Sequence, residues 1–179
     1  KFGFIVVGSN NSKNGPSEPI NKAYLALKKE IEKRFSVDSK RYYSIGMSGG
    51  SRVALRFANQ EPDLFRGVIA CAAFLSPDAS FKDKNIFIYG LVGDEDFNYS
   101  EYKRGFGLLE KTKTSFWIEI YKGVHQWPPK EKIFDAIEMF DYWHQKNGEN
   151  KGLAQAEKII KNRISLIDQL IAQKAWVHA

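Results

Sequence analysis

A serine lies among glycines at Gly46-Met47-Ser48-Gly49-Gly50, between two segments of different structural preference. Residues 41–45 favour a β-strand, and residues 52–58 favour a helix. A strand, a tight turn and a helix that meet at a serine form a nucleophile elbow, which raises the serine hydroxyl above the sheet. We expect this crowded turn to require glycine two residues before the serine and two residues after it.

The residue after the serine adds a second chemical feature. Gly49 would begin the helix, so its backbone amide would face any oxyanion that forms at Ser48. A G-x-S-x-G pattern also occurs by chance, and an ordinary glycine-rich turn is the alternative interpretation. The β-prone residues before the serine and the helical residues after it supply the context that catalysis requires.

Two later loops contain groups that would activate Ser48. The acidic loop Gly93-Asp94-Glu95-Asp96 follows an apolar segment at 86–92, and His125 follows another at 116–121. A serine hydroxyl is a weak nucleophile until an imidazole accepts its proton, and a carboxylate on the other imidazole nitrogen fixes the tautomer. Each loop alone is more often structural or merely solvated. Their order along the chain, serine then acid then histidine, favours a joint role.

The whole chain alternates between apolar and amphipathic segments. Buried strands are expected near 2–7, 41–45, 68–73, 86–89 and 116–121, and helices near 18–35, 52–58, 102–111 and 133–144. This alternation predicts an α/β fold in which helices, including the one at 18–35, cover a parallel sheet on both faces. Functional sites in such folds lie beyond the carboxyl ends of the strands.

The composition of the chain limits the classes of partner that we expect it to bind. The chain has 179 residues, of which 43% are hydrophobic, so it can bury a core. Its single cysteine, Cys71, excludes an internal disulfide, and its apolar neighbours indicate a buried thiol. The net charge of +6 is scattered and lacks a basic stripe interleaved with aromatic residues, and no run of 18 apolar residues is present. We therefore expect neither a nucleic-acid partner nor a membrane partner.

Taken together, the elbow and the two loops resemble those of the α/β-hydrolases, nearest the poly(3-hydroxybutyrate) depolymerase-like and feruloyl-esterase-like serine esterases. The resemblance covers residues 2–145 and includes His125-Gln126-Trp127-Pro128-Pro129. It implies a three-layer sandwich with a mostly parallel sheet. In that family the acid commonly lies three residues after a glycine that closes its strand, which favours Asp96 over Asp94 and Glu95.

One feature of that family has no counterpart in this sequence. The family has an additional strand before the one that residues 2–7 resemble, and the loop after that additional strand supplies the second oxyanion donor. We therefore expect either an N-terminally incomplete hydrolase core or a second donor from the loop at 8–14. The chain begins at Lys1 and not at a methionine, so the sequence leaves the cellular compartment open. A removed targeting segment would be consistent with secretion or periplasmic export.

The leading hypothesis is a serine carboxylic-ester hydrolase that works through an acyl-enzyme, on a small-molecule or polymer-linked ester. Ser48 would attack, and His125 would act as general base and then as general acid. Asp96 would orient the histidine, and the Gly49 amide would stabilise the oxyanion. No metal or organic cofactor is implied. The alternatives are a serine peptidase of the same fold and a non-catalytic binding module that retains the elbow.

Three further residues are candidates for substrate binding. Phe97 and Trp127 lie beside the acid and the histidine, where they would form an aromatic wall or would simply pack in the core. Asn10 lies on the polar loop at 8–16, which is either a plain connection or a rim of the pocket.

The last segment of the chain lies outside the resemblance. We divide the chain into a hydrolase core at 1–147 and a C-terminal helical extension at 148–179. Apolar residues of the extension recur at intervals of three and four, which predicts an amphipathic helix. Its stripe is expected to be buried on the core, to form an oligomer contact through 153–171, or to begin a longer helical module. The stripe consists of Leu153, Ala156, Ile160, Ile164, Ile167 and Ile171.

Overall fold

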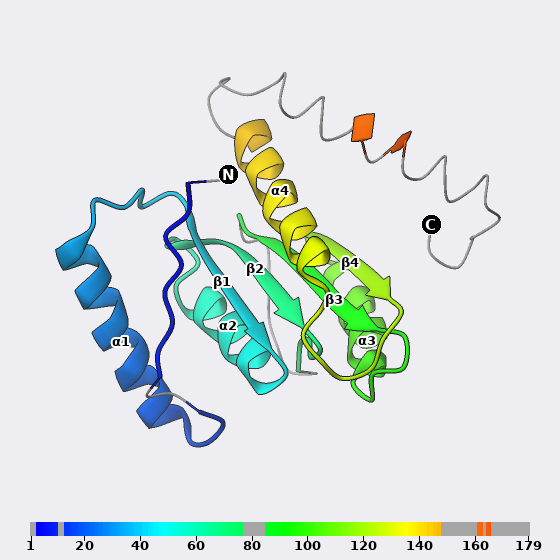
Figure 1. Ribbon diagram of the computed structural model, residues 1–179, viewed down its shortest axis with the longest axis horizontal. Helices are drawn as coiled ribbons and strands as arrows, with labels where there is room; N and C mark the ends of the chain where they lie inside the picture. The colour runs from blue at the N-terminus through cyan, green and yellow to red at the C-terminus, as the bar shows by residue number, and fades with distance from the viewer. Residues whose placement is uncertain (1–2, 11–12, 77–84, 148–160, 163, 166–179) are drawn as a thin grey trace. The chain divides into compact units, whose positions relative to one another are not determined.

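The computed structural model describes residues 3–10, 13–76, 85–147, 161–162 and 164–165 (Figure 1). The chain forms two compact units, Lys1–Ser39 and Lys40–Ala179, which are described separately.

The N-terminal unit contains one long helix, α1 (Ser17–Arg34), which confirms the helix expected at 18–35. Pro16 precedes it, Glu18 lies in its first turn, and Lys33 and Arg34 lie in its last turn, where these charges complement the helix dipole. Ion pairs four residues apart support the exposed face, and one of them joins Glu30 and Arg34 at 2.8 Å. The packing of α1 on the sheet stays a prediction.

The strand expected at residues 2–7 is not formed, so this prediction is wrong. Residues 3–9 have no regular secondary structure, and the side chains of Ile5, Val6 and Val7 are exposed. An apolar β-prone run becomes a strand only where a neighbouring strand pairs with its backbone. In the described part of the chain, the sheet consists of four other strands.

The larger unit is built on a parallel sheet with the strand order β1-β2-β3-β4 (Figure 1). This order follows the sequence, so each strand pairs with the strand that precedes it in the chain. The strands are β1 (Tyr42–Met47), β2 (Phe65–Cys71), β3 (Phe87–Gly93) and β4 (Ser115–Tyr121). The helices are α2 (Gly49–Gln60), α3 (Tyr99–Leu109) and α4 (Lys130–Asn147).

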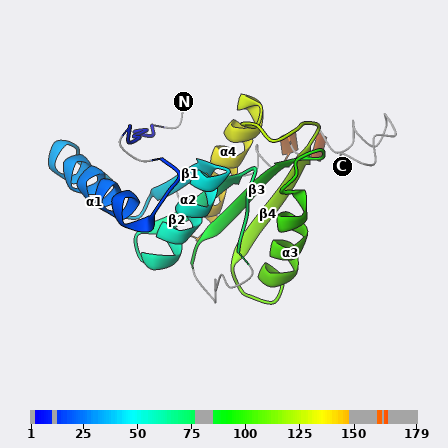
Figure 2. The same ribbon diagram turned by 90° about the horizontal axis from the view of Figure 1, so that it is seen from below.

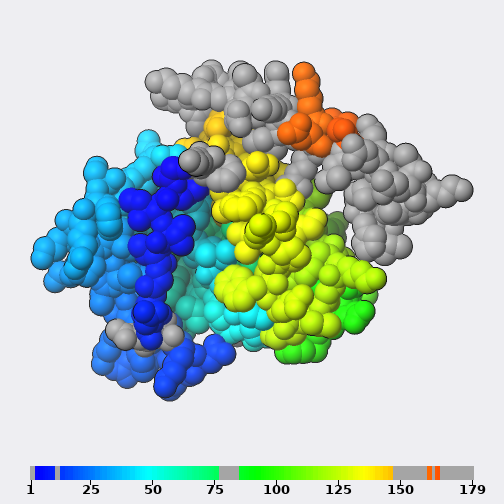
Figure 3. Space-filling view, viewed as in Figure 1, coloured from blue at the N-terminus to red at the C-terminus, as the bar shows by residue number. Residues whose placement is uncertain are grey.

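Helices cover both faces of this sheet, which confirms the expected α/β sandwich. Figure 2 shows α2 and α3 on one face and α4 on the other. In the space-filling view, the side chains of α4 lie over the middle of the sheet face that this helix covers (Figure 3). Strands β2 and β3 are buried along almost their whole length, as strands between two helical layers must be. None of the described helices is both long enough and apolar enough to cross a membrane.

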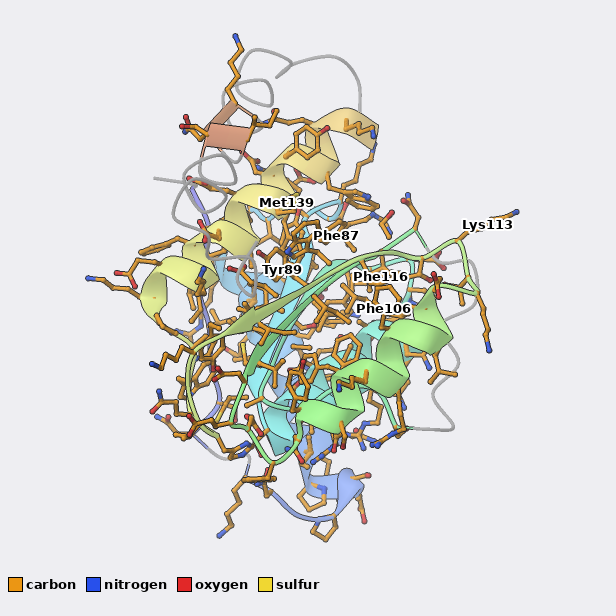
Figure 4. The ribbon with its side chains drawn as sticks, turned by 90° about the vertical axis from the view of Figure 1, so that its right-hand side faces the viewer. Phe87, Tyr89, Phe106, Lys113, Phe116 and Met139 are labelled. Atoms are coloured by element: carbon orange, nitrogen blue, oxygen red, sulfur yellow. The ribbon has the colours of Figure 1, made fainter. Side chains whose placement is uncertain are left out.

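An aromatic cluster joins α4 to the sheet. The Phe140 ring stacks on Tyr43 at 5.0 Å between centroids and meets Phe87 edge-on at 5.8 Å. Gly67 lies beneath that ring, and a Cβ there would come within 2.9 Å of it. Figure 4 shows Phe87 and Tyr89 on the α4 side of the sheet. Burying each such side chain stabilises the fold by roughly 1.5–3 kcal/mol.

The opposite face is held by a second set of aromatic contacts. Phe106 of α3 meets Phe116 of β4 edge-on at 5.5 Å (Figure 4). The buried rings of Phe74 and Tyr102 stack at 4.6 Å, and Gly105 of α3 leaves the space that Phe74 occupies. Aromatic side chains therefore pack between helix and sheet on both faces.

The single cysteine lies at the end of β2. Cys71 is fully buried, and this burial raises the pKa of its thiol to about 12. The thiol therefore stays protonated at neutral pH, as expected for a structural rather than a reactive cysteine.

The helix expected in the C-terminal extension at 148–179 falls almost entirely outside the described residues. Ile164 is described and is 52% exposed, so it is not buried against the rest of this chain. An oligomer contact through this stripe, or a longer helical module, stays a prediction. Periodicity identifies the apolar face of a helix but not the surface that covers it. Leu153, Ala156, Ile160, Ile167 and Ile171 lie outside the described residues. The division at 147 stays a prediction.

Two glycines of α3 provide a matched test of this packing. A Cβ at Gly105 would lie 2.1 Å from Cδ1 of Phe74, whereas a Cβ at Gly107 would meet nothing within 4 Å. We expect Gly105→Ala to lower the free energy of unfolding by about 1–3 kcal/mol through overpacking. Gly107→Ala should raise it by about 0.5–1 kcal/mol through helix propensity. Urea denaturation measures both, and equal effects would contradict the packing of Phe74 on α3.

Candidate active site

Ser48 lies in the turn between β1 and α2, as the sequence predicts. Its backbone has φ 55° and ψ −121°, a left-handed conformation that is rare for a residue with a side chain. Such a conformation costs on the order of 1–3 kcal/mol and persists only where its surroundings hold it. The Ser48 N–H donates to the Cys71 carbonyl at 2.8 Å, and the Ser48 carbonyl accepts the Ser51 N–H at 3.0 Å. The turn is thus fixed between the next strand and its own helix.

Only one of the two glycines expected to be essential has a steric reason in this turn. A Cβ at Gly46 would lie 2.1 Å from the Gly50 carbonyl oxygen, so strand and helix meet there backbone to backbone. A Cβ at Gly50 would meet nothing within 4 Å, so the expected steric requirement at residue 50 is wrong. The crowding involves the main chain of residue 50, which every amino acid carries.

The structure brings Ser48, His125 and Asp96 together at the carboxyl edge of the sheet. The Nε2 atom of His125 is 3.0 Å from the Ser48 hydroxyl oxygen. The Nδ1 atom of His125 is 3.0 and 3.1 Å from the two carboxylate oxygens of Asp96. Because β1, β3 and β4 are parallel, the loops that follow them meet at this edge. These distances allow proton transfer from serine to histidine and orientation of histidine by the acid.

Asp96 lies deepest of the three. Its side chain is fully buried, whereas 20% of the His125 side chain is exposed. A buried carboxylate needs hydrogen-bond donors, and Oδ1 accepts the Asn98 N–H at 2.8 Å in addition to its contact with His125. Asp94 and Glu95 are exposed, and the structure places Asp96 rather than either of them against the imidazole.

Asn98 is a site residue that sequence reasoning missed. It precedes α3 in the N-cap position, yet its side chain does not cap the helix. Instead, its Nδ2 donates to the carbonyl of Ala72 at 2.9 Å, just beyond β2, where Ala72 has a φ of 56°. Asn98 therefore connects the acid loop to the end of the central strand. An Asn before a predicted helix was a visible signal, but it would have indicated capping.

The candidate substrate-binding residues differ in setting. Phe97 is 74% exposed and Trp127 is 53% exposed, so neither residue packs in the core. The Phe97 ring lies 4.0 Å from the His125 ring between centroids, so it flanks the imidazole directly. Asn10 is exposed in the N-terminal unit, and its role in substrate binding stays a prediction, as does a second oxyanion donor from the loop at 8–14.

Gly49 is the first residue of α2 and directly follows Ser48. The first N–H groups of a helix have no carbonyl partner within the helix, and the helix dipole favours negative charge beside them. The Gly49 amide can therefore serve as a donor to an oxyanion at Ser48.

The described part of the chain offers no arrangement of three or more His, Cys, Asp or Glu side chains that could hold a metal ion. A cavity of about 290 Å³ lies beside α2, but its lining does not include the three residues above. The candidate site is therefore defined by its hydrogen bonds, and this cavity is separate from it. The cavity is lined by Arg52, Val53, Leu55, Arg56, Asn59, Phe74, Leu75 and Ser76.

Comparisons with protein-family models and with curated protein sequences found no match. Solved structures do match. FphF, a fluorophosphonate-binding serine hydrolase of Staphylococcus aureus, superposes with a TM-score of 0.54 and 15% identity over 69% of this chain and 62% of its own. The S-formylglutathione hydrolase FrmB of S. aureus has a TM-score of 0.51 and 16% identity, over 80% of this chain and 60% of its own. A ferulic acid esterase has a TM-score of 0.51 and 17% identity, over 64% of this chain and 55% of its own.

The chain has the α/β-hydrolase fold. At these identities the matches concern the fold alone. The chain spans 62% of FphF, 60% of FrmB and 55% of the ferulic acid esterase. Within this α/β-hydrolase fold, the elbow strand is β1, and the acid and the histidine follow β3 and β4.

The contact between Gly46 and Gly50 leads to a second prediction. Gly46→Ala should lower the free energy of unfolding by roughly 3 kcal/mol or more, because a main-chain atom blocks the new methyl group and the elbow must open. Gly50→Ala should change it by less than about 1 kcal/mol. Urea denaturation of both variants makes the comparison. Similar large losses in both would show that residue 50 also requires glycine.

Proposed function

We propose that the protein is a serine hydrolase that cleaves carboxylic esters through an acyl-enzyme. The observation that carries this proposal is the unbroken hydrogen-bonded series Ser48–His125–Asp96, with the serine in a strained elbow. The matched structures support it, since by name they are serine hydrolases and esterases. A narrower assignment, to the depolymerase-like and feruloyl-esterase-like branch, rests on the sequence resemblance.

In the proposed reaction, the Ser48 hydroxyl oxygen attacks the ester carbonyl while Nε2 of His125 accepts its proton. The tetrahedral intermediate collapses when the imidazolium gives this proton to the leaving alcohol. Water then attacks the acyl-enzyme by the same proton transfers in reverse, which releases the acid and restores Ser48. Asp96 keeps the neutral tautomer that presents a lone pair to the serine and stabilises the imidazolium.

The Gly49 amide is the oxyanion donor that we assign. It is adjacent to the nucleophile in sequence, so the elbow that strains Ser48 also fixes the donor. One such donor contributes roughly 3–4 kcal/mol to the transition state because it is aligned before charge develops. Phe97 and Trp127 offer apolar surface beside the histidine, which suits a substrate with an apolar acyl or alcohol group.

Two other functions are less well supported. A serine peptidase would use the same groups, but the names of the matched structures favour ester and related acyl substrates. A binding module would have no reason to keep Ser48 at a φ of 55° or to bury the Asp96 carboxylate, because both features cost stability. The strained serine therefore favours catalysis over simple packing.

Substitutions at the acid and the nucleophile test this proposal. With a p-nitrophenyl ester, Asp96→Asn should lower turnover by roughly four orders of magnitude, because the asparagine amide would favour the wrong histidine tautomer. Ser48→Ala should abolish labelling by a fluorophosphonate probe. Glu95→Gln is the matched control on the same loop, and it should retain turnover within about twofold, since exposed substitutions of this kind have small effects.

The competing functions give different outcomes. A binding module would leave the parent chain unlabelled by the probe. A peptidase would also cleave a p-nitroanilide of the same acyl group at a measurable rate, whereas an esterase would leave this amide intact. Equal losses in Asp96→Asn and Glu95→Gln would remove Asp96 from its proposed role.

A further inference from the structure

We propose that Asp94 is a positioning residue that sets the main-chain position of the histidine loop, in addition to the orientation of the imidazole by Asp96. This inference rests on the proposed function. Oδ1 of Asp94 accepts the Gly123 N–H at 2.9 Å, two residues before His125. The Asp94 N–H donates to the Tyr121 carbonyl at 2.9 Å, at the end of β4. Asp94 thus binds the chain on both sides of Lys122.

Gly123 is held by the acid loop through both of its backbone polar groups. Its N–H is bound by the Asp94 side chain, and its carbonyl accepts the Glu95 N–H at 3.0 Å. The approach is so close that a Cβ on Gly93 would lie 2.1 Å from the Gly123 carbonyl oxygen. Movement of Gly123 would therefore break two hydrogen bonds and would shift the residues that lead to His125.

The other end of the histidine loop is anchored differently. Lys132, in the first turn of α4, forms an ion pair with Glu119 of β4, and Glu119 also accepts the Tyr89 hydroxyl at 2.6 Å. The Tyr121 hydroxyl donates to the Gln126 carbonyl at 3.3 Å, just beyond His125. These contacts join β4, α4 and the loop to one another. The two hydrogen bonds between the acid loop and Gly123 connect the histidine loop to the loop that carries Asp96.

The chemistry of the contact defines what residue 94 must provide. The Gly123 N–H needs an acceptor oxygen at this position, and the side-chain amide of asparagine carries one in the same place as aspartate. The negative charge is not required for positioning. Alanine removes the acceptor, and since Asp94 is exposed, its removal leaves the core intact. The effect of Asp94 should therefore follow the presence of the oxygen and not the charge.

The test compares Asp94→Ala, Asp94→Asn and the control Glu95→Ala in the full chain. The first readout is the second-order rate of fluorophosphonate labelling at Ser48. We expect Asp94→Ala to lower this rate tenfold to a hundredfold, because a small misplacement of a catalytic group has effects on the order of a hundredfold. Asp94→Asn and Glu95→Ala should stay within about threefold of the parent, with an unchanged pH profile, since neither removes the acceptor oxygen of residue 94.

The second readout is hydrogen exchange of the Gly123 amide by NMR, which does not depend on catalysis. Exchange should be about tenfold faster in Asp94→Ala and unchanged in Asp94→Asn, because only alanine removes the acceptor. Parent-like labelling or parent-like exchange in Asp94→Ala would overturn the inference. Labelling lost equally in Asp94→Asn and Asp94→Ala would also overturn it, because charge would then matter. A parent chain that does not react with the probe would instead overturn the proposed function, and with it the catalytic meaning of this contact.

Discussion

The candidate site depends on two places where main chains approach so closely that only glycine fits. At the elbow, Gly46 lies against the carbonyl of Gly50, and at the other loops Gly93 lies against the carbonyl of Gly123. In both cases a Cβ would come within 2.1 Å of a backbone oxygen. The first contact fixes Ser48 at the end of its strand, and the second joins the loop that carries Asp96 to the loop that carries His125. The site is thus built mainly by backbone proximity, which leaves little freedom for its side chains to drift.

The end of β2 connects these two places although none of its side chains belongs to the Ser48–His125–Asp96 series. The Cys71 carbonyl accepts the Ser48 N–H, and the Ala72 carbonyl accepts the side chain of Asn98 on the acid loop. Below them, the buried Tyr102 hydroxyl lies 2.8 and 2.9 Å from the carbonyl oxygens of Ala70 and Leu91. Hydrogen bonds between buried groups of this kind are stronger where water is excluded, because the local dielectric constant is low. The end of β2 therefore sets the spacing between Ser48 and the loop that carries Asp96.

The sequence predicted those parts of the fold that depend on local pattern. The elbow, the strands β2 to β4 and the order of the three polar residues were all visible, because apolar runs and glycine spacing are local signals. The expected strand at 2–7 failed because a strand needs a partner elsewhere in the chain. Ile164 is not buried on its own chain for a similar reason, since a periodic apolar stripe does not indicate which surface covers it.

Two contacts in the site could not have been read from any pattern. Asp94 and Gly123 are 29 residues apart, and Asn98 and Ala72 are 26 residues apart. Each pair joins a common loop residue to a main-chain atom, so nothing in the spacing marks it. Sequence identified Asp96 only because the resemblance supplied a position relative to Gly93. Hydrogen bonds from side chains to distant backbone atoms are what the folded chain adds.

Asp96 is more deeply buried than His125, and this difference suits the proposed reaction. The Asp96 side chain is fully buried, whereas the His125 side chain is 20% exposed beside the open ring of Phe97. A carboxylate without contact to water interacts more strongly with an imidazolium than a solvated one does, because the local dielectric constant is lower. The Asn98 N–H and the imidazole satisfy its oxygens, so the negative charge stays aimed at Nδ1. In the proposed reaction, the positive charge that forms on the imidazole is therefore stabilised from the buried side of the ring, where Asp96 lies.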